Sequence, residues 1–493
     1  MQAMNRNKRM DGKIVKLSEL LKHTEHTLSG GDTEITAVTN DSRLVKKGSL
    51  FVAVRGYQTD GHAYIGKAIE NGAAAILCEE EVTAPVPVAV CKDTRRALAE
   101  VGALYYGEPA KKLKIIGVTG TNGKTTTTYL IKQVLDLLGY KTGLIGTNQN
   151  IIGDEILPAA RTTPESIDLQ KLLADMVSAG VTHVIMEVSS HSLALSRTHG
   201  IEFYEAVFTN LTRDHLDFHE TMENYMEAKA KLFSQSRHGV INIDDAYGAE
   251  VLKRAECPVM TYGTKNAADL FGENIRLSER GVIASTKLGG VPYEIRLGIP
   301  GMFSVYNALA ATAACLGMGI PMDDILKGLI LAKGVKGRAE VVPLSAPYTV
   351  IIDYAHTPDG LENIIKTVRG FAKGRVITMF GCGGDRDKTK RPIMGEMAAA
   401  LSDFAVVTSD NPRTEEPMAI IRDIEAGMTA YKDKYTVVEN RKEAIAYAMD
   451  TAQAGDIIIL AGKGHETYQI LKDGTIDFDE RAIVKEIFKN AGN

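Results

Sequence analysis

The chain has 493 residues, which at roughly 150 residues per domain predicts about three domains. Hydrophobic residues make up 44% and charged residues 24% of the sequence, enough to bury several cores. The formal net charge is -5 with acids and bases interspersed, and no apolar run is long enough to cross a bilayer. We therefore expect small-molecule substrates, no nucleic acid and no membrane insertion.

The cysteines and the first residues bear on the cellular compartment. Five cysteines show no C-x-x-C spacing, which argues against a disulfide framework or a zinc ribbon and favours a reducing environment. Residues 1–13 are basic, but no apolar segment follows them, so no signal peptide is expected. We expect a cytoplasmic monomer. The pattern assigns no role to residues 1–9, and Met10 is an alternative start.

Short apolar runs alternate with helix-like patterns along almost the whole chain, which predicts α/β domains with largely parallel sheets. A basic, Pro-containing stretch at 108–114 and a Gly-rich stretch at 332–342 predict boundaries that give units at 1–112, 113–337 and 338–493. The runs that predict strands are 49–54, 73–78, 114–118, 182–190, 205–211, 348–354, 375–381, 404–410 and 455–464. Helix-like patterns include 64–72, 124–140 and 307–319.

A glycine-rich turn, "VTGTNGKTTT", joins the apolar run at 114–118 to the helix-like pattern at 124–140. Such a turn points backbone N–H groups and the helix dipole at an anion, so it predicts a nucleoside triphosphate site. Lys124 is expected to reach the terminal phosphates and Thr125 to hold magnesium. The strict P-loop pattern has glycine where this chain has Val118, and an ordinary turn before a helix is the alternative. The expected ATP contacts in this turn are Gly120, Thr121, Asn122, Gly123, Lys124, Thr125 and Thr126.

Two further candidates follow this motif. Glu187 ends an apolar run, where an acid of a P-loop domain can hold magnesium; by itself it would be a helix cap or solvated. His215 and His219 lie four residues apart, so a zinc pair is an alternative, although no third ligand stands at useful spacing. Otherwise both are polar residues of a surface loop. Lys229 and Lys231 follow, and the pattern alone does not distinguish them from solvated helix lysines.

Several longer sequence motifs occur along the chain in an order that is typical of one enzyme family. The strings are "GTNGKTTT", "EVSSHSL", "TNLTRDHLDFH", "YMEAK", "GMFSVYNALAA", "VKGRAE" and "DYAHTPD". In these strings the chain resembles the Mur ligases, the ATP-dependent amide-forming enzymes of peptidoglycan precursor synthesis, over nearly its whole length. It is most similar to the members that add a diamino acid to UDP-N-acetylmuramoyl-L-alanyl-D-glutamate. The resemblance implies an N-terminal uridine-nucleotide-binding α/β domain, a central P-loop ATPase-like parallel sheet and a C-terminal Rossmann-like α/β domain.

The resemblance also implies roles around the nucleotide. Lys229 matches the lysine that family members carry as a CO2-derived carbamate, an anion that can bind magnesium beside Glu187 and His215. Lys231 lacks this match. Asn307 corresponds to the adenine contact of the family. The contacts implied across the second boundary are Arg338 and Asp353, with His356 a weaker candidate nearby and a conceivable proton acceptor.

For the uridine-linked substrate, the stretch "NDSRLVKKGSLFVAVRGYQTDGHAY" resembles the first domain of the family. The positions that match its substrate contacts are Ser42, Gln58 and Thr59 there, and Thr162, Thr163, Ser189 and Arg197 in the central unit. Two positions depart from some members, because Arg161 stands where they have asparagine and Leu195 where they have glutamine.

The motif "DNPR" at 410–413 bears on the amino acid that is added. Meso-diaminopimelate has a zwitterionic far end, which needs a planar cation for its carboxylate and an acid for its ammonium. Arg413 provides the fork, and Asp410 and Asn411 are expected acceptors; L-lysine would leave Arg413 unpaired. An Asx–proline turn with a solvated arginine is the alternative. The remaining positions that the family implies for this pocket are Arg386, Pro412, Gly462 and Glu466.

The expected reaction starts with attack of the D-glutamyl γ-carboxylate on the γ-phosphate of ATP, and the acyl phosphate is then attacked by the amine of diaminopimelate. We expect closure of the third domain over the other two, since water would hydrolyse the acyl phosphate. Four alternatives stay open: the same ligase adding L-lysine, a folylpolyglutamate-synthase-like ligase, a P-loop switch and a zinc hydrolase.

Overall fold

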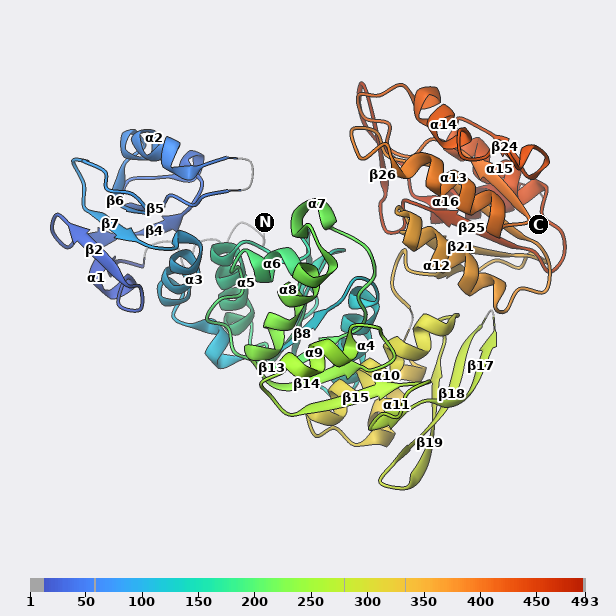
Figure 1. The fold of residues 1–493 in the computed structure, drawn as a ribbon, viewed down its shortest axis with the longest axis horizontal. Coiled ribbons are helices and arrows are strands. Elements are labelled where there is room, and N and C mark those ends of the chain that lie inside the picture. Colours follow the sequence, from blue (N-terminus) through green and yellow to red (C-terminus); the bar gives the residue numbers. More distant parts are fainter. Residues whose placement is uncertain (1–12, 57–58, 279, 333, 491–493) are drawn as a thin grey trace.

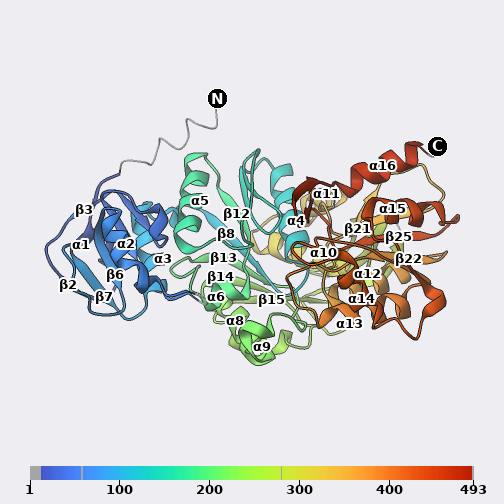
Figure 2. The same ribbon diagram turned by 90° about the horizontal axis from the view of Figure 1, so that it is seen from above.

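The computed structural model describes residues 13–56, 59–278, 280–332 and 334–490. Three large sheets, of five, nine and six strands, follow one another along the described chain, and Figures 1 and 2 show them side by side in sequence order. Each large sheet is mainly parallel, so the prediction of α/β domains with largely parallel sheets is confirmed. Helices among the described residues are all too short or too polar to span a bilayer.

The first sheet has the strand order β2-β7-β6-β5-β4, and all its pairs are parallel except β2 with β7. Its strands are β2 (His26–Ser29), β4 (Ala37–Thr39), β5 (Ser49–Val52), β6 (Ala73–Cys78) and β7 (Val88–Cys91), with helices α1 (Leu17–Leu20), α2 (Ile65–Glu70) and α3 (Thr94–Tyr105). A short pair, β1 (Val15–Lys16) with β3 (Glu34–Ile35), stands beside it. Helix α3 docks on the central part, where Glu100 Oε1 lies 3.1 Å from His199 Nε2.

The central sheet has nine strands in the order β11-β10-β9-β12-β8-β13-β14-β15-β16. Its strands are β8 (Lys114–Thr119), β9 (Thr142–Ile145), β10 (Asn150–Ile152), β11 (Glu155–Leu157), β12 (His183–Glu187), β13 (Phe203–Phe208), β14 (Ser236–Asn242), β15 (Val259–Gly263) and β16 (Leu270–Phe271). Among these described strands β10 alone runs in the opposite direction, because it pairs antiparallel with both β9 and β11. Strand β8, in the middle of the sheet, is buried at every residue after Lys114 because helices cover both faces, as expected for a parallel sheet.

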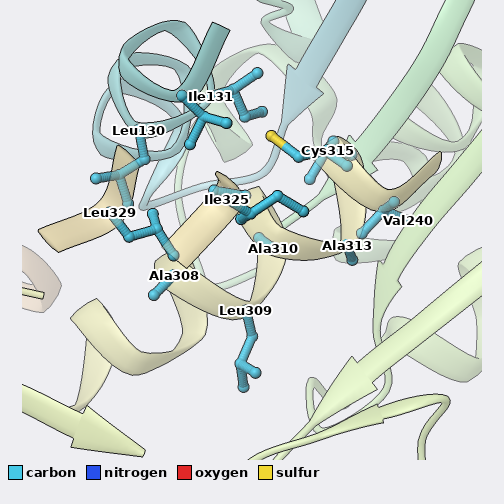
Figure 3. Packing of buried hydrophobic residues seen from close by; sticks show 14 of the residues in the cluster. Leu130, Ile131, Val240, Ala308, Leu309, Ala310, Ala313, Cys315, Ile325 and Leu329 are labelled. Atoms are coloured by element: carbon cyan, nitrogen blue, oxygen red, sulfur yellow. The ribbon is translucent and has the colours of Figure 1, made fainter. Parts of the chain in front are cut away.

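Different helices cover the two faces of the central sheet. One face carries α4 (Lys124–Leu137), α10 (Met302–Gly317) and α11 (Met322–Ile330), and the other carries α5 (Ser166–Ser178), α6 (Ser190–Ala194), α8 (Met222–Ser234) and α9 (Gly248–Arg254). Figure 3 shows the first layer, in which the small side chains of α10, such as Ala308 and Ala313, lie among Leu130, Ile131 and Val240. Alanines at these positions let α10 approach α4 closely. The glycine turn before α4 is thereby fixed to the sheet.

A three-stranded antiparallel sheet was not predicted from the sequence. It consists of β17 (Glu273–Ser278), β18 (Gly281–Leu288) and β19 (Val291–Leu297), between β16 and α10. Gly289 and Gly290 form the tight turn from β18 to β19, both with positive φ. A Gly-Gly pair between alternating strands is a recognised hairpin signal, so the information was present in the sequence.

The third sheet has the order β20-β21-β25-β22-β23-β24, with only β20 antiparallel. Its strands are β20 (Glu340–Val342), β21 (Thr349–Asp353), β22 (Val376–Phe380), β23 (Phe404–Val407), β24 (Tyr435–Val437) and β25 (Ile457–Ala461). One face carries α12 (Pro358–Arg369), α13 (Lys390–Leu401) and α14 (Pro417–Glu425), and the other carries α15 (Arg441–Asp450) and α16 (Glu480–Asn490). A hairpin, β26 (Tyr468–Leu471) with β27 (Gly474–Asp477), follows β25.

Candidate nucleotide and amino-acid sites

The glycine turn lies between the carboxyl end of β8 and the first residue of α4, where a phosphate cradle requires it. Gly120 has φ +147° and Gly123 has φ +86°, both in the region that favours glycine. A Cβ atom on Gly120 would collide with Thr209 Oγ1, and one on Gly123 would approach Asn307 Oδ1 to 2.5 Å. Both glycines are therefore required by backbone shape and by close neighbours.

Lys124, the first residue of α4, lies over this turn. Its Nζ donates to the carbonyl oxygens of Gly120 and Thr121, each at 2.9 Å. Burial lowers the pKa of Lys124, and the Glu187 carboxylate acts in the opposite direction. The ammonium therefore stands at the turn, where the charge of a phosphate would be.

Glu187 ends β12, the neighbour of β8 in the sheet, and its side chain is 1% exposed. Thr125 Oγ1 donates to Glu187 Oε1 at 2.9 Å. Thr147 also donates to this carboxylate, from its backbone N–H and from its hydroxyl, each at 3.0 Å. A carboxylate and hydroxyl oxygens in contact are the hard donors that Mg²⁺ prefers.

Thr147 was missed in the sequence analysis. It follows β9, which pairs with β12, so its position at the carboxyl edge of the same sheet could have indicated it.

Lys229 lies on α8, behind the glycine turn, and its side chain is 1% exposed. Its Nζ donates to Gly120 O at 2.9 Å and lies 4.5 Å from the ring centroid of Tyr225. Burial, with the charge of Lys124 added, lowers the pKa of Lys229 well below its ordinary value, while Asp214 opposes the shift. A buried amine in its neutral form is a nucleophile, and that form can add to CO2.

The two histidines considered as a zinc pair have different surroundings. His219 is 5% exposed, its Nε2 lies 2.8 Å from Ser190 Oγ, and its ring stacks on Tyr225. Burial lowers the pKa of His219 to about 4. His215 is exposed, with Nε2 3.4 Å from Asp214 Oδ2, and it lines the pocket at the glycine turn. Within the ranges that the structure describes, no three His, Cys, Asp or Glu side chains are grouped to hold a metal ion.

A pocket at the glycine turn joins residues from distant parts of the chain. Its lining consists of Thr121, Asn122, Gly123, Lys124, Thr125, Thr126, Thr147, Thr162, Glu187, Ser189, His215 and Arg338. Arg338, from beyond the second boundary, lies with Cζ 5.1 Å from the ring centroid of Tyr354, and its Nε is buried without a hydrogen-bond partner among the described residues. A guanidinium with an unused N–H in this pocket suits an anionic ligand.

The other expected nucleotide contacts lie next to this pocket. Asp353 accepts the backbone N–H groups of Ala339 at 2.7 Å and Ala355 at 2.9 Å, which connects it to the segment that carries Arg338. Burial raises the pKa of Asp353, and the charge of Arg338 opposes this. Asn307 is 4% exposed and packs against Gly123.

The exposed side chain of His356 has Nδ1 2.8 Å from Tyr354 O, so it is held by its own turn.

One contact between the second and third units was not predicted. Asp359, in the first turn of α12, accepts from Thr212 Oγ1 at 2.9 Å and from Asn122 Nδ2 at 3.2 Å. The third unit thus contacts the glycine turn itself.

The residues expected to contact the muramoyl peptide fall into two groups. Thr162 and Ser189 line the pocket at the glycine turn. Thr163 and Arg197 lie behind them, because Thr163 is 0% exposed with its hydroxyl bonded to Glu187 O, and Arg197 donates to Thr163 O at 3.2 Å. Thr163 and Arg197 therefore lie behind the pocket and support its lining.

In the first unit, Ser42 is partly buried and Thr59 is exposed. Gln58 and residues 1–9 lie outside the described residues.

The residues expected to bind the added amino acid come together at the carboxyl ends of β22, β23 and β25, which are neighbours in the third sheet. The loops that follow these strands supply Arg386; Asp410, Asn411, Pro412 and Arg413; and Gly462 with Glu466. Arg413 has a positive φ of 52°, and its NH1 donates to Gly384 O at 2.9 Å. Asn411 Nδ2 donates to Glu466 Oε2 at 3.0 Å. Arg386 is exposed beside them. Both charge signs therefore meet in one cluster.

Family descriptions match three successive parts of the chain. "Mur ligase family, catalytic domain" matches residues 34–106, "Mur ligase middle domain" 118–315 and "Mur ligase, glutamate ligase domain" 337–464. The chain belongs to the Mur ligase family. Figure 1 shows that the three matches fall on the three successive sheets of the chain.

Relatives within the Mur ligase family cover almost the whole chain. The UDP-N-acetylmuramoyl-L-alanyl-D-glutamate–2,6-diaminopimelate ligase of Clostridium botulinum is 50% identical over 483 residues, 96% of this chain and 100% of the relative. A ligase of the same name, numbered 1, from Clostridium acetobutylicum is 51% identical over 482 residues, 96% of this chain and 99% of the relative.

Solved structures are also similar to this chain over most of its length. One of a UDP-N-acetylmuramoyl-L-alanyl-D-glutamate–2,6-diaminopimelate ligase aligns with a TM-score of 0.72 and 32% identity, over 98% of this chain and 100% of that chain. The folylpolyglutamate synthase of Mycobacterium tuberculosis complexed with ADP and AMPPCP aligns with a TM-score of 0.60 at 21% identity, over 75% of this chain and 92% of that chain. This second likeness concerns the fold alone.

Proposed function

We propose that this protein is an ATP-dependent ligase that joins meso-diaminopimelate to the D-glutamyl γ-carboxylate of UDP-N-acetylmuramoyl-L-alanyl-D-glutamate in peptidoglycan precursor synthesis. The relatives named for this reaction span the full length of the chain. The observation that carries the proposal is the third-unit cluster, in which Arg413 and Arg386 stand with Asp410 and Glu466. A cluster with both charge signs suits the zwitterionic far end of diaminopimelate. We further propose that the enzyme acts as a cytoplasmic monomer on small-molecule substrates.

Three units share this work in the proposal. Residues 1–112 bind the uridine nucleotide, with Ser42, Gln58 and Thr59 as proposed contacts. Residues 113–337 bind ATP at the glycine turn, and residues 338–493 bind the amino acid. Arg338 and Asp353 extend the ATP site from the third unit, and Asn307 faces the adenine from α10. The contact of Asp359 with Asn122 supports an arrangement in which ATP is bound between units.

Magnesium fits the residues at the turn, because Thr125 and Glu187 already place hydroxyl and carboxylate oxygens in contact. His215 and a carbamate on Lys229 would complete the set of ligands. Once bound, Mg²⁺ would withdraw charge from the phosphate oxygens. The low pKa of Lys229 favours carbamate formation, and the remaining N–H of a carbamate can still donate to Gly120 O.

The proposed reaction has two steps. The γ-carboxylate of the substrate attacks the γ-phosphorus of ATP, the bond to the bridging oxygen breaks, and ADP leaves with the electron pair. Lys124 and the N–H groups of the glycine turn neutralise the charge that accumulates on the phosphate oxygens. The free amine of diaminopimelate then attacks the acyl carbon, loses a proton and expels phosphate, which leaves an amide. Thr162 and Ser189, supported by Thr163 and Arg197, hold the muramoyl peptide.

Phosphate release from Mg-ATP tests this proposal directly. We expect fast release only when both UDP-N-acetylmuramoyl-L-alanyl-D-glutamate and meso-diaminopimelate are present, with no more than a residual rate with L-lysine and a product whose mass equals the substrate plus one diaminopimelate minus water. Release with L-lysine instead would keep the ligase but refute the amino acid, and release with neither amino acid would favour a P-loop switch.

The matched variants lie on one helix. Lys124→Met should abolish release, whereas Lys132→Met, which removes a surface ion pair with Asp136, should leave it unchanged.

A further inference from the structure

Lys463 is a fully buried lysine to which the motifs assigned no role. It follows β25, its side chain is 0% exposed, and its Nζ lies 5.7 Å from the ring centroid of Tyr468. Nζ donates to Asn411 Oδ1 at 3.1 Å and to Glu466 Oε2 at 3.0 Å. Burying an ammonium is costly unless it is paired and hydrogen-bonded, and these two contacts supply both. Both partners belong to the proposed amino-acid site.

The contacts of Asn411 determine what this side chain can offer a ligand. Its Oδ1 faces two groups that can only donate, the Lys463 ammonium and the backbone N–H of Ile470 at 2.9 Å. An amide oxygen has two lone pairs, so its acceptor capacity is filled. Nδ2 must then carry the hydrogens, one of which goes to Glu466. Asn411 therefore has one N–H left for a ligand and no lone pair, which replaces the acceptor role expected from the sequence.

Glu466 is left with the complementary capacity. Its Oε2 accepts from Asn411 and Lys463, whereas Oε1 has no donor within the part of the chain that the structure describes. One oxygen thus remains for an ammonium, close to the N–H that remains on Asn411. An N–H beside a carboxylate oxygen matches a carboxylate and an ammonium on one carbon.

We infer that Lys463 is a positioning residue for amino-acid specificity. It holds Asn411 in the donor orientation, so that this side chain donates to a substrate carboxylate and favours substrates that have one. The inference rests on the proposed function. Without the ammonium at 463, Oδ1 keeps only the Ile470 N–H as a donor, so the donor orientation is held less firmly and the amide oxygen can turn toward the substrate carboxylate, which repels it. Binding of diaminopimelate should weaken, and L-lysine, which has no far carboxylate, should be affected little.

The test compares steady-state KM and kcat for meso-diaminopimelate, L-lysine, ATP and the UDP-linked substrate. Lys463→Met keeps the unbranched length of the side chain and removes the ammonium. We expect its KM for meso-diaminopimelate to rise at least about tenfold, as for loss of one charge-assisted hydrogen bond. The KM values for ATP and the UDP-linked substrate should stay within about twofold, with kcat at saturation nearly unchanged. Lys442→Met, at an ion-paired surface lysine of the same unit, is the matched control and should behave as wild type.

A second variant tests the same idea if Lys463→Met does not fold. Asn411→Asp is isosteric and still accepts from Lys463 and Ile470, but it has no N–H to donate. It should also raise the KM for meso-diaminopimelate at least about tenfold. An unchanged KM in either folded variant would refute the inference, and so would a parallel rise for all substrates in Lys463→Met. If the wild-type chain released no phosphate with any amino acid, the proposed function itself would be refuted, and the inference with it.

Discussion

Replacing Arg413 should separate diaminopimelate from lysine more sharply than any other single change. NH1 of this arginine donates to Gly384 O at 2.9 Å and Asn411 O at 3.3 Å, which orients the guanidinium; with respect to the described residues, its other N–H groups stay available for a ligand. Two charge-assisted hydrogen bonds to a carboxylate contribute about 1.5 kcal/mol each, so Arg413→Ala should lose about 3 kcal/mol. That free energy corresponds to a fall of about 100-fold in kcat/KM for meso-diaminopimelate.

Arg413→Lys keeps the positive charge but not the planar two-donor group, so kcat/KM for meso-diaminopimelate should fall about tenfold instead of about 100-fold. The assay is phosphate release at saturating ATP and UDP-linked substrate, with kcat/KM measured for each amino acid. The residual activity with L-lysine should change by less than about threefold, because its far end has no carboxylate to lose a partner. Equal losses of kcat/KM for both amino acids would show that Arg413 supports the loop through Gly384 and does not bind the far carboxylate of the substrate.

Three further changes follow from the central unit. Glu187→Gln should lower phosphate release by more than about 100-fold while the thermal midpoint changes little, because the amide still contacts Thr125 but cannot neutralise a cation; wild-type activity at any magnesium concentration would contradict this. Gly120→Ala should lose ATP binding in a nucleotide titration, since its φ of +147° and the neighbouring Thr209 leave no room for a methyl group; an unaltered Kd would contradict the cradle. Burial raises the pKa of Glu205 well above its ordinary value of 4.5, because the carboxyl group is removed from water, so the neutral form is favoured in the folded state. Its stabilising contribution is complete below the unfolded pKa and is lost as pH rises through the folded pKa; Glu205→Gln should therefore gain stability over wild type by up to about 1.4 kcal/mol per pH unit above pH 4.5, and denaturation curves with identical pH dependence would refute this.

The parts of the site that sequence could predict are those built by local rules. The glycine turn needs only a buried strand, glycines and a helix start, and all three stand next to one another in the chain. Glu187 was found because it ends an apolar run in a P-loop domain, and the structure shows that this run is β12, the neighbour of β8. Thr147 obeys the same rule on the next strand, but a threonine is less conspicuous than an acid, and strand order is not visible in a sequence. Lys463 needed still more, because its role depends on loops from two strands that only the fold places together.

Lys229 and Lys231 show how far helix periodicity reaches when it is applied to single residues. Residues two positions apart on an α-helix point in directions that differ by about 200°, so the two lysines cannot both face the core. Tyr225, Leu232 and Phe233 lie four residues before, three after and four after Lys229, which places this lysine on the apolar stripe of α8. The structure has Lys229 buried and Lys231 exposed. Helical spacing could therefore have separated the two lysines, although the sequence analysis left both as candidates for solvated residues. A buried lysine needs a chemical reason, and the lowered pKa of this amine against Gly120 O supplies one that periodicity cannot, since it depends on a turn more than 100 residues earlier in the chain.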